Sequence, residues 1–106
     1  MCVDQIKQIE CNQLYIKLIE KYGINAQLIK TAEEAVELAK AALKLQQAHG
    51  TEQQEKWRRE LAEEIADSQL LIEQLIEYFD LNDLITYYRH MKLQRIKMLI
   101  EDGEAT

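Results

Sequence analysis

The sequence predicts an all-α fold of four helices in a single domain that spans residues 1–106. The chain contains three glycines and no proline, so few positions interrupt a helix. Between the glycines, apolar residues recur at intervals of three and four, and no useful stretch alternates with the period of two that strands require. We therefore expect helices over residues 4–22, 25–48, 51–79 and 82–101.

The expected helix ends coincide with residues that favour them. Gly23 and Gly50 stand where a left-handed residue would end the first and second helices. Thr51, with a glutamine three residues later, has the spacing of a capping box, and Asn82 is a favourable N-cap for the fourth helix. The acidic tail over residues 101–106 is expected to be frayed.

The second helix is apolar on two of its sides. One stripe comprises Leu28, Ala35 and Ala39, and the other comprises Leu38, Ala41 and Leu45. A helix that is apolar on two sides is buried on two sides. In so small a chain this predicts a homo-oligomer, in which partner subunits complete the helical bundle.

Composition excludes several classes of protein. Thirteen basic and nineteen acidic residues give a net charge of −6, which argues against a nucleic acid polymer as partner. No stretch approaches the ~18 apolar residues of a membrane span. Asp4, Lys7 and Glu10 interrupt any signal peptide, so we expect a cytoplasmic protein that does not interact with membranes.

Carboxylates cluster on the second and third helices. Glu64 interrupts an apolar seam of the third helix, where an uncompensated carboxylate is costly or becomes neutral, and Asp67 follows one turn later. On the second helix, Glu34 lies in line with one of the two apolar stripes, and Glu33 and Glu37 flank it. Because a turn lets the two helices run antiparallel, these oxygens suit a hard divalent cation such as Mg²⁺.

Two other interpretations compete with a magnesium site. Acidic runs are often solvated faces, and Arg58 or Lys40 could pair with several of these groups. A di-iron bundle requires Glu-x-x-His on two helices. The residues three before His49 and His90 are glutamine and tyrosine, so the di-iron alternative is excluded.

The fourth helix has basic residues on an apolar face. Arg95 interrupts the line of Leu84, Tyr88, Met91 and Met98, and Lys92 borders the same arc. The two side chains could extend past a core to water, or they could bind phosphate oxygens, for which the guanidinium offers a bidentate fork.

Two motifs resemble those of a known family. Residues 33–37 match EExxE and residues 64–67 match ExxD, with 26 residues between them. Together they resemble the MazG-like nucleoside triphosphate pyrophosphohydrolases. Residues 22–28 and 92–95 also fit, so the resemblance covers nearly the whole chain.

The resemblance implies an Mg²⁺-dependent hydrolase, with Mn²⁺ as a substitute, that cleaves the α–β phosphoanhydride of a nucleotide to a monophosphate and pyrophosphate. Glu34, Glu37, Glu64 and Asp67 would hold the metal. Glu33 would orient the attacking water or assist a second ion.

The same resemblance assigns substrate contacts and an assembly. Lys92 and Arg95 would bind the phosphates, and Gln27 is a candidate for contact with the base or sugar. The expected fold is a four-helix MazG-like bundle completed in a dimer or tetramer. Two alternatives stay open: a phosphoribosyl-ATP pyrophosphohydrolase, which shares the motif layout, and a non-catalytic helical adaptor or regulatory protein.

Overall fold

A computed structural model describes residues 7–103, and this part of the chain forms four α-helices and no strand. The helices are α1 (Gln8–Tyr22), α2 (Ile24–Gln47), α3 (Gly50–Phe79) and α4 (Asn82–Asp102). The all-α prediction is therefore confirmed. Residues 4–6 of the first expected helix and residues 104–106 of the expected frayed tail lie outside the described residues, whereas Glu101 and Asp102 are in the last turn of α4.

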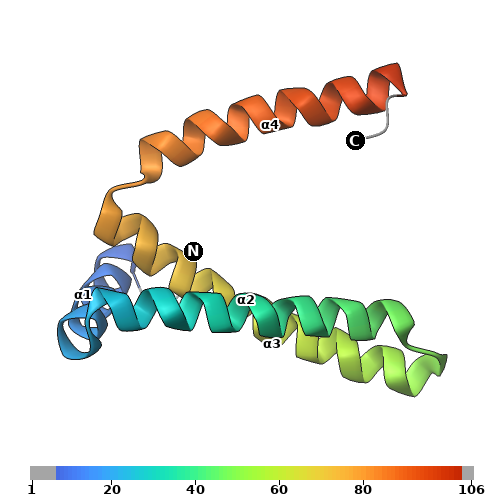
Figure 1. Cartoon of the computed structure of the whole chain (residues 1–106), viewed down its shortest axis with the longest axis horizontal. Helices are drawn as coiled ribbons and strands as arrows, with labels where there is room; N and C mark the ends of the chain where they lie inside the picture. Colours follow the sequence, from blue (N-terminus) through green and yellow to red (C-terminus); the bar gives the residue numbers. More distant parts are fainter. Residues whose placement is uncertain (1–6, 104–106) are drawn as a thin grey trace.

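The long helices α2 and α3 lie side by side and form the body of the molecule (Figure 1). Their shielded positions follow the spacing of three and four: on α2 these include Gln27, Thr31, Glu34, Leu38, Ala41 and Leu45, and on α3 they include Trp57, Leu61, Glu64, Ser68, Leu71 and Gln74. Such spacing places one face of each helix against the other. The seam so formed is apolar in part, but glutamines and glutamates interrupt it.

Helix α1 packs across one end of the α2–α3 pair (Figure 1). It buries Cys11 and Tyr15. The Tyr15 hydroxyl donates a hydrogen bond to the Glu73 carboxylate on α3, and burial raises the pKa of this phenol above its usual value of 10.0. The bond ties the first helix to the third across 58 residues of sequence.

The expected N-caps of α3 and α4 are wrong, and Gly50 begins α3 rather than ending α2, whose C-cap is Ala48. Helix α3 begins at Gly50 after His49, and the side chain of Gln53 accepts a hydrogen bond of 3.0 Å from the His49 N–H, so Thr51 is inside the helix. The N-cap of α4 is Leu81, and Asn82 is already helical. Neither N-cap residue, His49 or Leu81, makes a capping hydrogen bond with its side chain.

The turn between α3 and α4 depends on a left-handed residue that is not glycine. Asp80 has φ 54°, a conformation that aspartate tolerates better than most residues. The N–H of Leu81 bonds to the Ile76 carbonyl at 3.0 Å, which closes the end of α3.

Helix α4 extends away from the other three helices and has no buried residue (Figure 1). Its exposed apolar side chains are Leu84, Tyr87, Tyr88, Met91, Leu93, Ile96, Met98 and Ile100. The Cα radius of gyration is 17.1 Å, whereas a compact domain of this length has about 13 Å. A single chain therefore leaves a large apolar surface open. Within residues 7–103, no helix is both long and apolar enough to cross a bilayer.

Candidate metal-binding site and adjoining groove

Three carboxylates converge at the middle of the α2–α3 seam. Glu34, Glu64 and Asp67 each offer one oxygen, and these oxygens lie within 4.8 Å of one another. Glu34 and Glu64 are half-buried, and Asp67 is exposed. We call this group the acidic cluster. The prediction that the two helices bring Glu34, Glu64 and Asp67 together agrees with this geometry.

The environment of Glu64 is unfavourable for its negative charge. Burial raises the pKa of Glu64 above 4.5, and the charge of Glu34 raises it further. Neutral Glu64 can also donate a hydrogen bond to Glu34, and the charges of Asp67 and Glu37 add smaller effects in the same direction. The ammonium of Lys30 lies 3.3 Å from a Glu34 oxygen, but it is itself half exposed. These surroundings therefore favour the neutral form of Glu64, and an added positive charge would favour its ionised form.

Two buried oxygens on α3 lack a partner among the described residues. These are Glu64 Oε2 and Ser68 Oγ, one turn apart. A buried polar atom without a hydrogen bond is costly. Oxygen atoms of carboxylates are the ligands that Mg²⁺ and Mn²⁺ prefer, so the unpartnered Glu64 oxygen and the two adjacent carboxylates fit a divalent cation.

The other two predicted acidic residues flank the cluster. Glu37 is exposed, lies close enough for its charge to raise the pKa of Glu64, and lines a small pocket with it. Glu33 is exposed and lines a groove on the other side, together with Glu34 and Asp67. All five predicted carboxylates therefore belong to one region, with Glu34, Glu64 and Asp67 at its centre.

A groove of about 570 Å³ begins at the acidic cluster and extends toward α1. Its walls include Leu18, Tyr22, Ala26, Leu70 and Leu71, and its polar lining includes Gln27, Lys30 and Gln74. Gln27, a predicted substrate contact, is buried and donates a hydrogen bond of 2.7 Å to Gln74 Oε1. A mostly apolar concavity with a few convergent polar groups is typical of small-molecule sites.

A smaller pocket of about 230 Å³ adjoins the opposite side of the cluster. Glu37, Glu60 and Glu64 line it together with Lys40, Ala41, Lys56 and Trp57. The Lys56 ammonium lies 4.9 Å from the centre of the Trp57 ring. This pocket therefore places two lysines and an indole next to the carboxylates.

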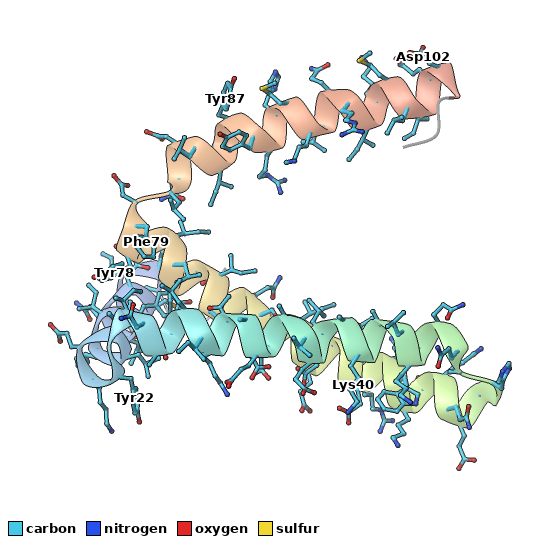
Figure 2. The ribbon with its side chains drawn as sticks, in the orientation of Figure 1. Tyr22, Lys40, Tyr78, Phe79, Tyr87 and Asp102 are labelled. Atoms are coloured by element: carbon cyan, nitrogen blue, oxygen red, sulfur yellow. The ribbon has the colours of Figure 1, made fainter. Side chains whose placement is uncertain are left out.

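The structure does not bring Lys92 and Arg95 to the acidic cluster of the same chain. Both line a pocket on α4 with Tyr87, Tyr88 and Met91. In Figure 2, Tyr22 and Lys40, which line the groove and the smaller pocket, lie on the side of the α2–α3 pair that faces away from α4. The basic residues of α4 and the acidic cluster therefore belong to separate surfaces of one chain.

Sequence reasoning missed Gln74, Lys30 and Ser68 as site residues. Gln74 lies seven residues after Asp67, as Gln27 lies seven before Glu34, so both glutamines continue the face of the cluster by two turns. A search for polar residues at seam positions, rather than for acidic motifs, would have found the pair. No protein-family model, curated protein or solved structure matches this chain.

Proposed function

We propose that this protein is an Mg²⁺-dependent nucleoside triphosphate pyrophosphohydrolase, which cleaves the α–β phosphoanhydride to release a nucleoside monophosphate and pyrophosphate. The observation that carries the proposal is the acidic cluster, in which Glu64 has a buried, unpartnered oxygen beside two other carboxylates. The adjoining groove supports it, because a substrate with an apolar, hydrogen-bonding portion next to a phosphate chain needs such a surface.

In this proposal Glu34, Glu37, Glu64 and Asp67 hold the cation. A divalent cation would supply neutralisation of phosphate charge and a water of lowered pKa. Mn²⁺ is the expected substitute, since it prefers the same oxygen ligands.

The remaining steps depend on side chains of the chain itself. Hydrolysis forms a bond from a water oxygen to the α-phosphorus, breaks the bond from that phosphorus to the bridging oxygen, and releases pyrophosphate with the electron pair of that bond, while the attacking water loses a proton to solvent. Glu33, at the edge of the groove beside Glu34, would accept a hydrogen bond from the attacking water and orient it. Lys30 would keep Glu34 in place through their 3.3 Å ion pair.

The phosphate contacts of Lys92 and Arg95 require a second chain in this proposal. A homo-oligomer, dimer or tetramer, would set α4 of one subunit against the α2–α3 pair of another. Two features support this: the exposed apolar residues of α4, and the complementary charge of its basic side chains and the acidic cluster. Arg95 and Lys92 would then neutralise the pyrophosphate that leaves.

A substrate panel tests the activity. Purified protein is incubated with each common ribo- and deoxyribonucleoside triphosphate and Mg²⁺, and pyrophosphate is measured. We expect release that Glu64→Gln abolishes. Absence of turnover of every triphosphate, with a metal response in thermal melts also absent, would favour the non-catalytic adaptor.

Mixing two inactive variants tests the assembly. We expect Glu64→Gln and Arg95→Ala proteins to be inactive alone and to regain activity when mixed, because a mixed oligomer forms sites with an intact cluster and an intact arginine. If mixing restores nothing while both variants are folded oligomers, Arg95 does not act on a neighbouring subunit.

A further inference from the structure

Two buried glutamines form a fixed pair at the floor of the groove. Gln27 on α2 is 8% exposed and Gln74 on α3 is 4% exposed, so they are among the least accessible of the described residues. The Gln27 Nε2 group donates to Gln74 Oε1 at 2.7 Å. Burying two amides in a seam that could have held leucines lowers the free energy of unfolding. The single bond between them satisfies only part of their hydrogen-bonding capacity.

The donor and acceptor atoms of the pair that make no hydrogen bond are accessible from the groove. Within residues 7–103, neither Gln27 Oε1 nor Gln74 Nε2 has a hydrogen bond to the protein, yet neither is a buried unpartnered atom. Both residues line the groove. The pair therefore presents one acceptor beside one donor, and the bond between the amides keeps them in a fixed orientation. Reversing both amides exchanges the two groups but preserves this pattern.

The distance from the pair to the acidic cluster suits a nucleoside. Gln27 and Glu34 lie seven residues apart on α2, and Asp67 and Gln74 lie seven apart on α3. Seven residues make two helical turns, or about 10 Å along the axis. In a nucleotide, the ribose and the base together span a similar length, from the α-phosphate to the far edge of the base.

The walls around the pair suit a flat heteroaromatic ring. Ala26 and Leu71 line the groove, as do Leu18 and Leu70, and Tyr22 adds an exposed aromatic ring. Apolar walls bind the faces of a base, while fixed polar groups recognise its edge.

We propose that the Gln27–Gln74 pair is a specificity element that recognises the edge of a nucleobase through its free acceptor and donor. The inference rests on the proposed function and deepens it, because it assigns the residues that recognise the base and the pattern that they require, a hydrogen-bond donor next to an acceptor.

The test removes the pair without leaving one amide unpartnered. In Gln27→Met/Gln74→Met, both amides are replaced by apolar side chains of similar shape, a change that is often nearly neutral for folding. Gln46→Met, at an exposed position of α2, is the matched control. Each protein is assayed with nucleoside triphosphates and with a triphosphate that carries an apolar isostere of the base.

The wild type and the control are expected to prefer the natural base over its isostere by about tenfold to a hundredfold in kcat/KM, the effect of two ordinary hydrogen bonds. The double variant should lose this preference, so that its kcat/KM values for the natural base and the isostere become about equal. An unchanged preference in a folded double variant overturns the inference but leaves the pyrophosphohydrolase proposal intact.

A second variant and a second measurement cover the other outcomes. If the double variant does not fold, Gln74→Met alone removes the free donor of the pair, and it should also lower the preference. If no protein turns over any triphosphate, the proposed function fails, and calorimetry with nucleosides alone still tests the pair. Equal nucleoside binding by the wild type and the double variant, or none by either, overturns the inference.

Discussion

Replacing Glu64 by glutamine should remove the response of the protein to divalent cations. The substitution keeps the size of the side chain but removes the charge from the centre of the acidic cluster, where Glu34 and Asp67 remain. A cation present at about 100 times its Kd adds about 2.7 kcal/mol to the free energy of unfolding. For a domain of about this length, that corresponds to a rise in Tm of roughly 10 to 20 °C.

The loss of a metal ligand leaves little of this stabilisation. If affinity falls by about a hundredfold, the same cation concentration adds only about 0.4 kcal/mol, or roughly 2 to 3 °C. The assay is thermal unfolding followed by circular dichroism, with and without Mg²⁺ or Mn²⁺. Glu63→Gln, at the adjacent exposed position of α3, is the control and should respond as the wild type does. A rise in Tm of equal size in the Glu64 and Glu63 variants would refute the cation site.

Two more predictions concern pH and the packing of α1. Because the pKa of Glu64 is raised in the folded chain, the stabilisation from its proton is complete below about pH 4.5 and is lost as pH rises through the folded value. In the absence of divalent cations, the Tm of the wild type should therefore fall over this range more than that of Glu64→Gln. Tyr15→Phe removes the hydrogen bond to Glu73 and should cost about 1 to 2 kcal/mol in urea unfolding. Urea midpoints equal to those of the wild type would show that this bond does not contribute.

Much of the fold follows from local patterns in the sequence. The spacing of three and four places Leu38 and Ala41 on the shielded face of α2 and Leu61 and Leu71 on that of α3. The same periodicity forms the other stripe of α2, whose residues Leu28, Ala35 and Ala39 are exposed in the part of the chain that the structure describes. The ends at Tyr22 and Phe79 and the start at Asn82 were predicted, but the N-cap residues of α3 and α4 were not, because they depend on turn geometry such as that of the left-handed Asp80.

The acidic cluster was predictable because a carboxylate at a seam position is costly unless a positive charge neutralises it. Glu34 and Glu64 each lie where a coiled pair of helices would place a leucine. Gln74 was not predicted, since a single glutamine on a helix carries no signal until its partner Gln27 is known from the packing. Local patterns also did not predict that α4 lies apart from the acidic cluster. The positions of Lys92 and Arg95 on α4 would suit the inner face of any helical bundle, whereas in the structure both line a pocket on α4 itself.

We expect the carboxylates in the α2–α3 seam to lower the free energy of unfolding of the metal-free protein. Leucines at the positions of Glu34 and Glu64 would bury apolar surface and would remove two like charges that face each other. We therefore expect Glu34→Leu/Glu64→Leu to have a higher Tm than the wild type without metal, and to show no change when Mg²⁺ is added. Thermal melts of both proteins, with and without the cation, measure this. A lower Tm of the metal-free double variant would mean that the carboxylates stabilise the seam themselves, and the argument that they require a cation would fail.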